Sequence, residues 1–162
     1  MTQIRFTGIP TEHAHDLQNG GVDANGHKAE LTISKGSSNP CRHCLKMVEE
    51  GEEMLVFALR PFKSVQPYAE QGPAFLHAEE CAPYEENGSG LPPVLHDSRN
   101  YIVRGYGLDE RIVYGTGKVT EQEDIMGRAN ELLENPDIEF VHVRSSSNNC
   151  WQARVERENN ST

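Results

Sequence analysis

The sequence has no long hydrophobic run. Its longest uninterrupted apolar stretch, residues 54–59, is far shorter than the roughly 20 residues that a membrane-spanning helix needs. Residues 1–10 also lack the basic start and the apolar segment of a secretory signal. We therefore expect a soluble, cytoplasmic protein with no membrane partner.

Positive charge is also scarce. The 162 residues include 15 lysines and arginines against 25 aspartates and glutamates, which gives a formal net charge of -10. A negative field of this kind repels phosphate backbones and anionic lipid headgroups, so we expect no nucleic-acid partner. The partner that remains is a small molecule or a protein that the sequence does not identify, and nothing in the sequence indicates an oligomeric state.

Cysteine is limited to four residues. A chain of this length can bury a core without disulfides, and a reducing compartment disfavours them. The four thiols are therefore expected to be metal ligands, reactive groups or core residues. We predict a single domain at residues 1–157, followed by a frayed tail at residues 158–162.

Short apolar segments in the chain predict β-strands. The predicted strands cover residues 1–9, 29–34, 54–60, 73–77, 138–144 and 150–157, and a hairpin is predicted for residues 101–106 and 111–119. Within the last strand, alternation places Trp151, Ala153 and Val155 on one face. The polar segment at residues 11–26 predicts a loop.

One segment has the spacing of an amphipathic helix. Thr120 and Glu123 match the capping-box pattern, and the segment ends at Asn135 and Pro136. Its apolar positions on one face are Ile125, Met126, Ala129, Leu132 and Leu133. We therefore predict an α+β fold with a mainly antiparallel sheet, one principal helix at about 121–134 and a zinc-knuckle-like insertion.

Two pairs of residues have the spacing of metal ligands. Cys41 and Cys44 are separated by two residues, and His77 and Cys81 by three. Three thiolates with one imidazole favour Zn²⁺, and a closed set of four protein ligands is typical of structural sites. His43, between the first two cysteines, is expected to face solvent.

Other interpretations of these residues stay open. Cys41 and Cys44 could be ordinary core residues beside a hydrogen-bonded His77, or they could form a redox pair. Glu79 and Glu80 could accept the His77 ring proton or lie exposed.

A second group of polar residues surrounds one short connection between two predicted strands. It consists of His142, Arg144, Asn148, Asn149 and Cys150. These side chains predict a pocket for a small ligand or an anion. The alternatives are a plain polar hairpin loop, a thiol enzyme using Cys150 and His142, or a metal-dependent hydrolase whose metal has three protein ligands. Cys150 could also replace one of the four proposed metal ligands, and Arg42 and Arg104 are expected to be solvated or paired with acids.

Several motifs resemble one bacterial family. The matching segments are residues 39–45, 51–55, 66–70, 72–78, 112–117, 141–144 and 148–150. Together they resemble the family called domain of unknown function 1203, from about Ile4 to Arg157. The resemblance implies a single-domain bacterial protein, but it implies no activity, substrate or catalytic residue.

Overall fold

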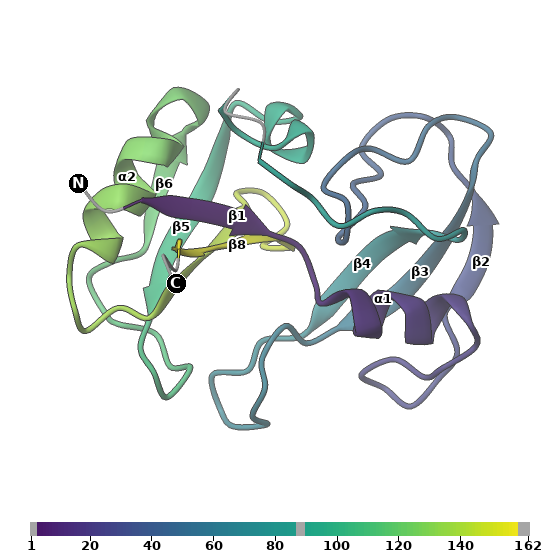
Figure 1. Cartoon of the computed structure of the whole chain (residues 1–162), viewed down its shortest axis with the longest axis horizontal. Coiled ribbons are helices and arrows are strands. Elements are labelled where there is room, and N and C mark those ends of the chain that lie inside the picture. Colours follow the sequence, from purple (N-terminus) through teal and green to yellow (C-terminus); the bar gives the residue numbers. More distant parts are fainter. Residues whose placement is uncertain (1–2, 87–89, 159–162) are drawn as a thin grey trace.

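The computed structural model describes residues 3–86 and 90–158 and contains two β-sheets (Figure 1). Neighbouring strands in both sheets are antiparallel. The five-stranded sheet contains, in spatial order, β1 (Ile4–Thr7), β8 (Trp151–Arg157), β7 (Phe140–Ser145), β5 (Asn100–Tyr106) and β6 (Lys118–Glu121). The three-stranded sheet contains β2 (Glu30–Ile33), β3 (Glu53–Leu59) and β4 (Gly72–His77). The predicted α+β fold with mainly antiparallel pairing is confirmed.

The principal helix is α2 (Ile125–Leu133), preceded by the short 3-10 helix η2 (Gln122–Asp124). It packs on the five-stranded sheet. The buried face contains Ile125, Ala129, Leu132 and Leu133, as the apolar spacing predicts, while the fifth predicted position, Met126, is only partly buried against the core. A second 3-10 helix, η1 (Pro93–His96), precedes β5. In the described chain, no helix has the length and apolar character that a bilayer crossing requires.

The two sheets have separate hydrophobic cores. One core lies between α2 and the five-stranded sheet, and the other joins the three-stranded sheet to α1 (Thr11–Gln18). Figure 1 shows the sheets side by side, with the chain crossing from β1 to α1 and returning after β4. The prediction of one domain at residues 1–157 stays a prediction. In the predicted tail, the Glu158 amide donates to the Gln3 carbonyl, and residues 159–162 lie outside the described residues.

Helix α1 corrects the prediction of a loop at residues 11–26. Of its eight residues only Ala14 and Leu17 are buried, so two apolar positions are the whole of its amphipathic signal. A short polar segment of this kind becomes helical through packing against the sheet, because isolated helices of this length are unstable.

The predicted hairpin forms in part, because Tyr106 pairs with Ile112 next to the turn. Strand β5 pairs with Lys118–Glu121, placing Tyr101 opposite Thr120, so most of residues 111–119 lies outside the strand. The capping box is also wrong, because the Thr120 hydroxyl donates to the Lys118 carbonyl and α2 has no side-chain cap. Strand pairing places Thr120 away from the helix end and therefore overrides the local signal.

A β-bulge changes the face on which Trp151 lies. Val143 pairs with Ala153, but Arg144 pairs with Trp151, so Gln152 has no partner in the register. Ala153 belongs to the core under α2, whereas Trp151 belongs to the core of the three-stranded sheet. The prediction of one shared face is therefore wrong, because an extra residue reverses the alternation of side chains.

Candidate functional site

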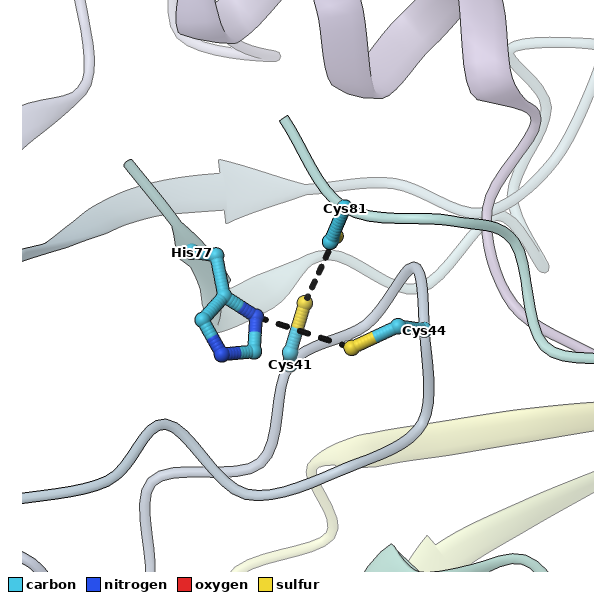
Figure 2. Close-up of side chains that lie close together, drawn as sticks. All are labelled: Cys41, Cys44, His77 and Cys81. Atoms are coloured by element: carbon cyan, nitrogen blue, oxygen red, sulfur yellow. Dashed lines mark hydrogen bonds between the residues drawn. The ribbon is translucent and has the colours of Figure 1, made fainter. Parts of the chain in front are cut away.

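The four predicted metal ligands come from two segments that meet on β4. Cys41 and Cys44 lie in a tight turn closed by a bridge between Pro40 and Met47. The Leu45 amide donates to the Cys41 carbonyl at 3.1 Å, and Leu45 adopts a left-handed conformation with φ 57. This geometry points both cysteine side chains to one side of the turn (Figure 2).

Backbone pairing docks this turn on β4. Cys41 forms a parallel bridge with Phe75, and the Arg42 amide donates to the Phe75 carbonyl at 3.0 Å. His77 is the last residue of β4, and Cys81 follows on the returning chain. The ligand atoms of all four residues lie within 4.8 Å of one another.

Two of the distances between the ligand atoms match the edges of a tetrahedron around zinc. The sulfur atoms of Cys41 and Cys81 are 3.8 Å apart, and the Cys44 sulfur is 3.5 Å from Nδ1 of His77. Ligands bound at about 2.3 Å for sulfur and about 2.0 Å for nitrogen, at tetrahedral angles, lie about 3.8 Å apart for two sulfurs and about 3.5 Å apart for a sulfur and a nitrogen. All four cysteines are free thiols, so no disulfide accounts for the approach.

The electrostatics of this cluster favour a bound cation. The neighbouring Cys41 and Cys44 raise the pKa of His77 to about 10. Hydrogen bonds from Cys44 and Cys81 lower the pKa of Cys41, while hydrogen bonds with Cys41 and Cys44, followed by burial and the charge of these thiolates, raise the pKa of Cys81. Three adjacent thiols cannot all ionise without a counter-charge, and a divalent cation supplies it.

Two side chains that the sequence analysis missed support the cluster. His43 is buried and does not face solvent as predicted, because Nδ1 lies 3.3 Å from the Cys81 sulfur and Nε2 lies 2.9 Å from the Thr11 hydroxyl. Oε1 of Glu52 lies 3.7 Å from Nε2 of His77. Neither position carries a local signal, since both contacts depend on how distant segments meet. Glu79 and Glu80 are exposed, and the Glu79 carbonyl accepts a hydrogen bond from Gln18.

The predicted ligand-binding residues are only partly brought together. Arg144 is 3 % exposed, donates to the Asn149 carbonyl at 2.9 Å and pairs with Glu70. The space beside Arg144 and Asn149 measures about 10 Å³, the volume of one water probe. His142 is fully buried on β7, and Asn148 is exposed in the loop.

Cys150 and His142 do not form a catalytic pair in this geometry. The Ser145 amide donates to the Cys150 carbonyl, so Cys150 lies beside Ser145. Three residues of strand, about 10 Å, separate that position from His142. The Cys150 thiol contacts the Asn148 carbonyl at 3.8 Å, and within the described chain Cys150 is not part of the metal-ligand cluster.

Two arginines expected at the surface have structural contacts. Arg42 is 3 % exposed and donates to the carbonyls of Trp151 and Pro40, both at 2.8 Å. Burial lowers its pKa to about 10. Arg104 pairs with Glu70 at 2.8 Å, which agrees with the expectation that it is either solvated or paired with an acid. The prediction that Arg42 is solvated or paired with an acid is therefore wrong. Its guanidinium binds backbone carbonyls in place of water and so joins the cysteine turn to β8.

Comparison with known protein families identifies a matching family. A family model described as "Protein of unknown function (DUF1203)" matches residues 38–157, which include the four candidate ligands. Neither the curated proteins nor the solved structures contain a match.

Proposed function

Since the chain belongs to the DUF1203 family, whose description assigns no activity, we propose from the site geometry that it is a zinc-binding domain. Cys41, Cys44, His77 and Cys81 hold one Zn²⁺ in this proposal. The observation that carries it is the pair of ligand distances, 3.8 Å and 3.5 Å, at the edges of a zinc tetrahedron.

The proposed zinc is structural. Four protein ligands complete a tetrahedral shell and leave no position for an activated water, which catalytic zinc requires. The ligands also join distant segments, because Cys41 and Cys44 lie in one turn while His77 and Cys81 lie at and beyond the end of β4. A zinc ion shared between these segments stabilises the three-stranded sheet on which they meet.

Metal analysis of matched cysteine variants tests this proposal. Zinc measured by mass spectrometry in the purified protein should be one ion per chain, and Cys44→Ser and Cys81→Ser should each lose it. Cys150→Ser is the matched control, since its thiol lies outside the cluster, and it should retain full zinc. Wild-type protein without zinc, or equal loss in the Cys150 variant, would sink the assignment.

Cobalt substitution separates a structural site from a catalytic one. With Co²⁺ in place of Zn²⁺, a closed site gives the intense absorption of tetrahedral coordination with thiolate ligands. A site with an open position instead changes its spectrum when an anion such as azide is added. Such a change would favour the metal-dependent hydrolase over the structural role.

We also propose that the protein works in the cytoplasm. The cluster needs three reduced thiols, and the acidic surface suits a small-molecule or protein partner better than nucleic acid or membrane. Fractionation of cells that express the chain, followed by thiol labelling, tests the location. Recovery of the chain with oxidised cysteines outside the cytoplasm would contradict it.

A further inference from the structure

A pocket of about 530 Å³ lies between the two sheets, and we refer to it as the inter-sheet pocket. Its walls come from the chain that joins β1 to α1, from residues 59–63 at and after the end of β3, and from β7 and β8. Its volume lies within the range of about 300–1,000 Å³ that is usual for small-molecule sites. The four candidate zinc ligands are not among its lining residues.

Aromatic and proline side chains form much of the wall. Phe62, Tyr84 and Trp151 contribute rings, and Pro10, Pro61 and Pro83 contribute flat apolar surface. His142 lies against this group, with its ring centroid 5.1 Å from that of Phe62 and 5.7 Å from that of Trp151. Surfaces of this kind favour the faces of a planar apolar ligand.

The carboxylates at the pocket already have partners. Glu110 accepts hydrogen bonds from the amides of Lys63 and Ser64 and from the Ser64 hydroxyl, at 2.8–2.9 Å. Glu156 accepts from Arg5 and from Nε of Arg154. These oxygens are therefore poorly placed to accept further bonds from a ligand.

Several polar groups of the lining residues, in contrast, have no partner within the described chain. The indole nitrogen of Trp151 is buried and has no hydrogen-bond partner in the described chain, and the same holds for both ring nitrogens of His142, one of which donates and one of which accepts in the neutral ring. The Lys63 side chain is exposed, and its ammonium makes no ion pair with any described residue. Indole and ammonium groups only donate hydrogen bonds, so a complementary ligand supplies acceptors.

The local charge also favours an anion. Arg60, Lys63 and Arg154 line the pocket against the two carboxylates described above, and Arg154 pairs with one of them, Glu156, at 2.9 Å, although the whole chain carries -10. The pKa of His142 lies well below its ordinary value. Burial is the main cause, and the positive charges of Arg144, Arg154 and Arg104 add to it. The imidazole is therefore neutral, and the potential around it is positive.

We propose that the inter-sheet pocket binds a small aromatic carboxylate. Its ring lies among Phe62, Tyr84 and Trp151, and its carboxylate lies toward Lys63 and Arg154. This inference goes beyond the proposed zinc site and does not depend on it. The two proposals can fail separately: the protein could bind zinc but no aromatic acid, or bind an aromatic acid but no zinc.

The only tryptophan of the chain, Trp151, reports on the pocket directly. Benzoate should change its fluorescence in a saturable manner in the full-length, purified protein, and 2-naphthoate should give saturable heat in calorimetry. Benzamide has the same shape without the charge, and its affinity should be about tenfold lower, as loss of a charge-assisted hydrogen bond implies. Acetate, which lacks the ring, should bind more weakly still.

Charge variants locate the carboxylate. Lys63→Gln and Arg154→Gln should each weaken benzoate binding about five- to tenfold. Arg99→Gln is the matched control, since Arg99 is 90 % exposed, pairs with Glu121 and does not line the pocket, and it should bind benzoate normally. If Arg154→Gln misfolds, the exposed Lys63 variant still decides the question.

Three results would overturn the proposal. The first is the absence of saturable binding for both aromatic acids. The second is equal affinity for benzoate and benzamide. The third is equal weakening by Lys63→Gln and Arg99→Gln, which would indicate general charge screening in place of a defined site.

Discussion

Nδ1 of His43 lies 3.3 Å from the Cys81 sulfur, and the opposite ring nitrogen lies 2.9 Å from the Thr11 hydroxyl. With a proton on Nδ1, the ring donates to the sulfur and accepts from Thr11. His43 also lines the inter-sheet pocket. A single buried imidazole thus contacts a candidate zinc ligand, the start of α1 and the pocket wall.

The first prediction concerns zinc affinity. Replacing His43 with alanine removes the hydrogen bond to the Cys81 sulfur, and loss of such a supporting contact lowers metal affinity by roughly 10–100-fold. Competition for zinc with a chromophoric chelator measures the change. His15→Ala is the control, because the His15 ring lies 6.4 Å from that of His43 and has no contact with the sulfur. Equal affinities of the two variants would contradict the role of His43.

The second prediction concerns Glu70, which pairs with Arg104 and Arg144 and accepts the Tyr106 hydroxyl at 2.7 Å. Glu70→Gln leaves two largely buried guanidinium groups without their counter-charge, so the free energy of unfolding should fall by roughly 3 kcal/mol. Urea denaturation measures it.

The matched control for Glu70 is Glu121→Gln. Glu121 pairs at 3.3 Å with Arg99, and both side chains are exposed, so this change should cost at most ~1 kcal/mol. Similar losses for the two variants would mean that the Glu70 pairs contribute no more than a surface ion pair.

The third prediction concerns the pH dependence of stability. Burial and three arginines keep His142 neutral in the folded protein, whereas the unfolded chain takes up a proton below its pKa of about 6.5. Stability from this residue is therefore complete above about pH 6.5 and falls as the pH decreases, by up to about 1.4 kcal/mol per pH unit. His142→Leu should abolish this loss.

Urea denaturation of the wild type and of His142→Leu, both loaded with zinc, at about pH 7.5 and about pH 5.5 measures this dependence. The difference between the proteins isolates His142, because His13 and His43, whose pKa values are also lowered by burial, titrate in both. A difference that does not change with pH would rule out the neutral, buried state of His142.

The fourth prediction concerns Gly8, beside the cysteine turn. A Cβ atom there would lie 2.3 Å from the Arg42 carbonyl oxygen and 2.5 Å from that of His43. Gly8→Ala should therefore lower the free energy of unfolding by about 1–3 kcal/mol, because backbone must move. Gly72→Ala is the control, since a Cβ atom at that position would meet no described atom within 4 Å, and thermal unfolding compares the two. If Gly8→Ala is as stable as the wild type, the backbone around Gly8 accommodates the added Cβ atom at little cost.

The candidate zinc cluster was predictable because its information is local. Cys41 and Cys44 share one turn, and His77 and Cys81 lie close together at the end of one strand. Only the docking of the turn on β4 had to be assumed. Strands with a buried face, such as β3 and β7, were predictable because their apolar residues mark burial directly in the sequence.

Features that depend on distant segments were not predictable. Trp151 reaches the inter-sheet pocket because of one unpaired residue, Gln152, and periodicity alone does not locate a bulge. His43 looked like a surface residue because its partners, Thr11 and Cys81, are 32 and 38 residues away. The predicted ligand loop was correctly placed between β7 and β8, but its Arg144 pairs with Glu70, far away in the sequence.

The pairing of β1 with β8 has a mechanical consequence. Ile4 lies opposite Arg157 and Thr7 opposite Arg154, so a force that pulls Gln3 away from Glu158 loads one end of the ladder first. Hydrogen bonds perpendicular to antiparallel strands then break one after another, as in a zipper, at low force. Strand β1 should peel away before the rest of the sheet yields, and the pocket wall that continues from Thr7 would lose its anchor.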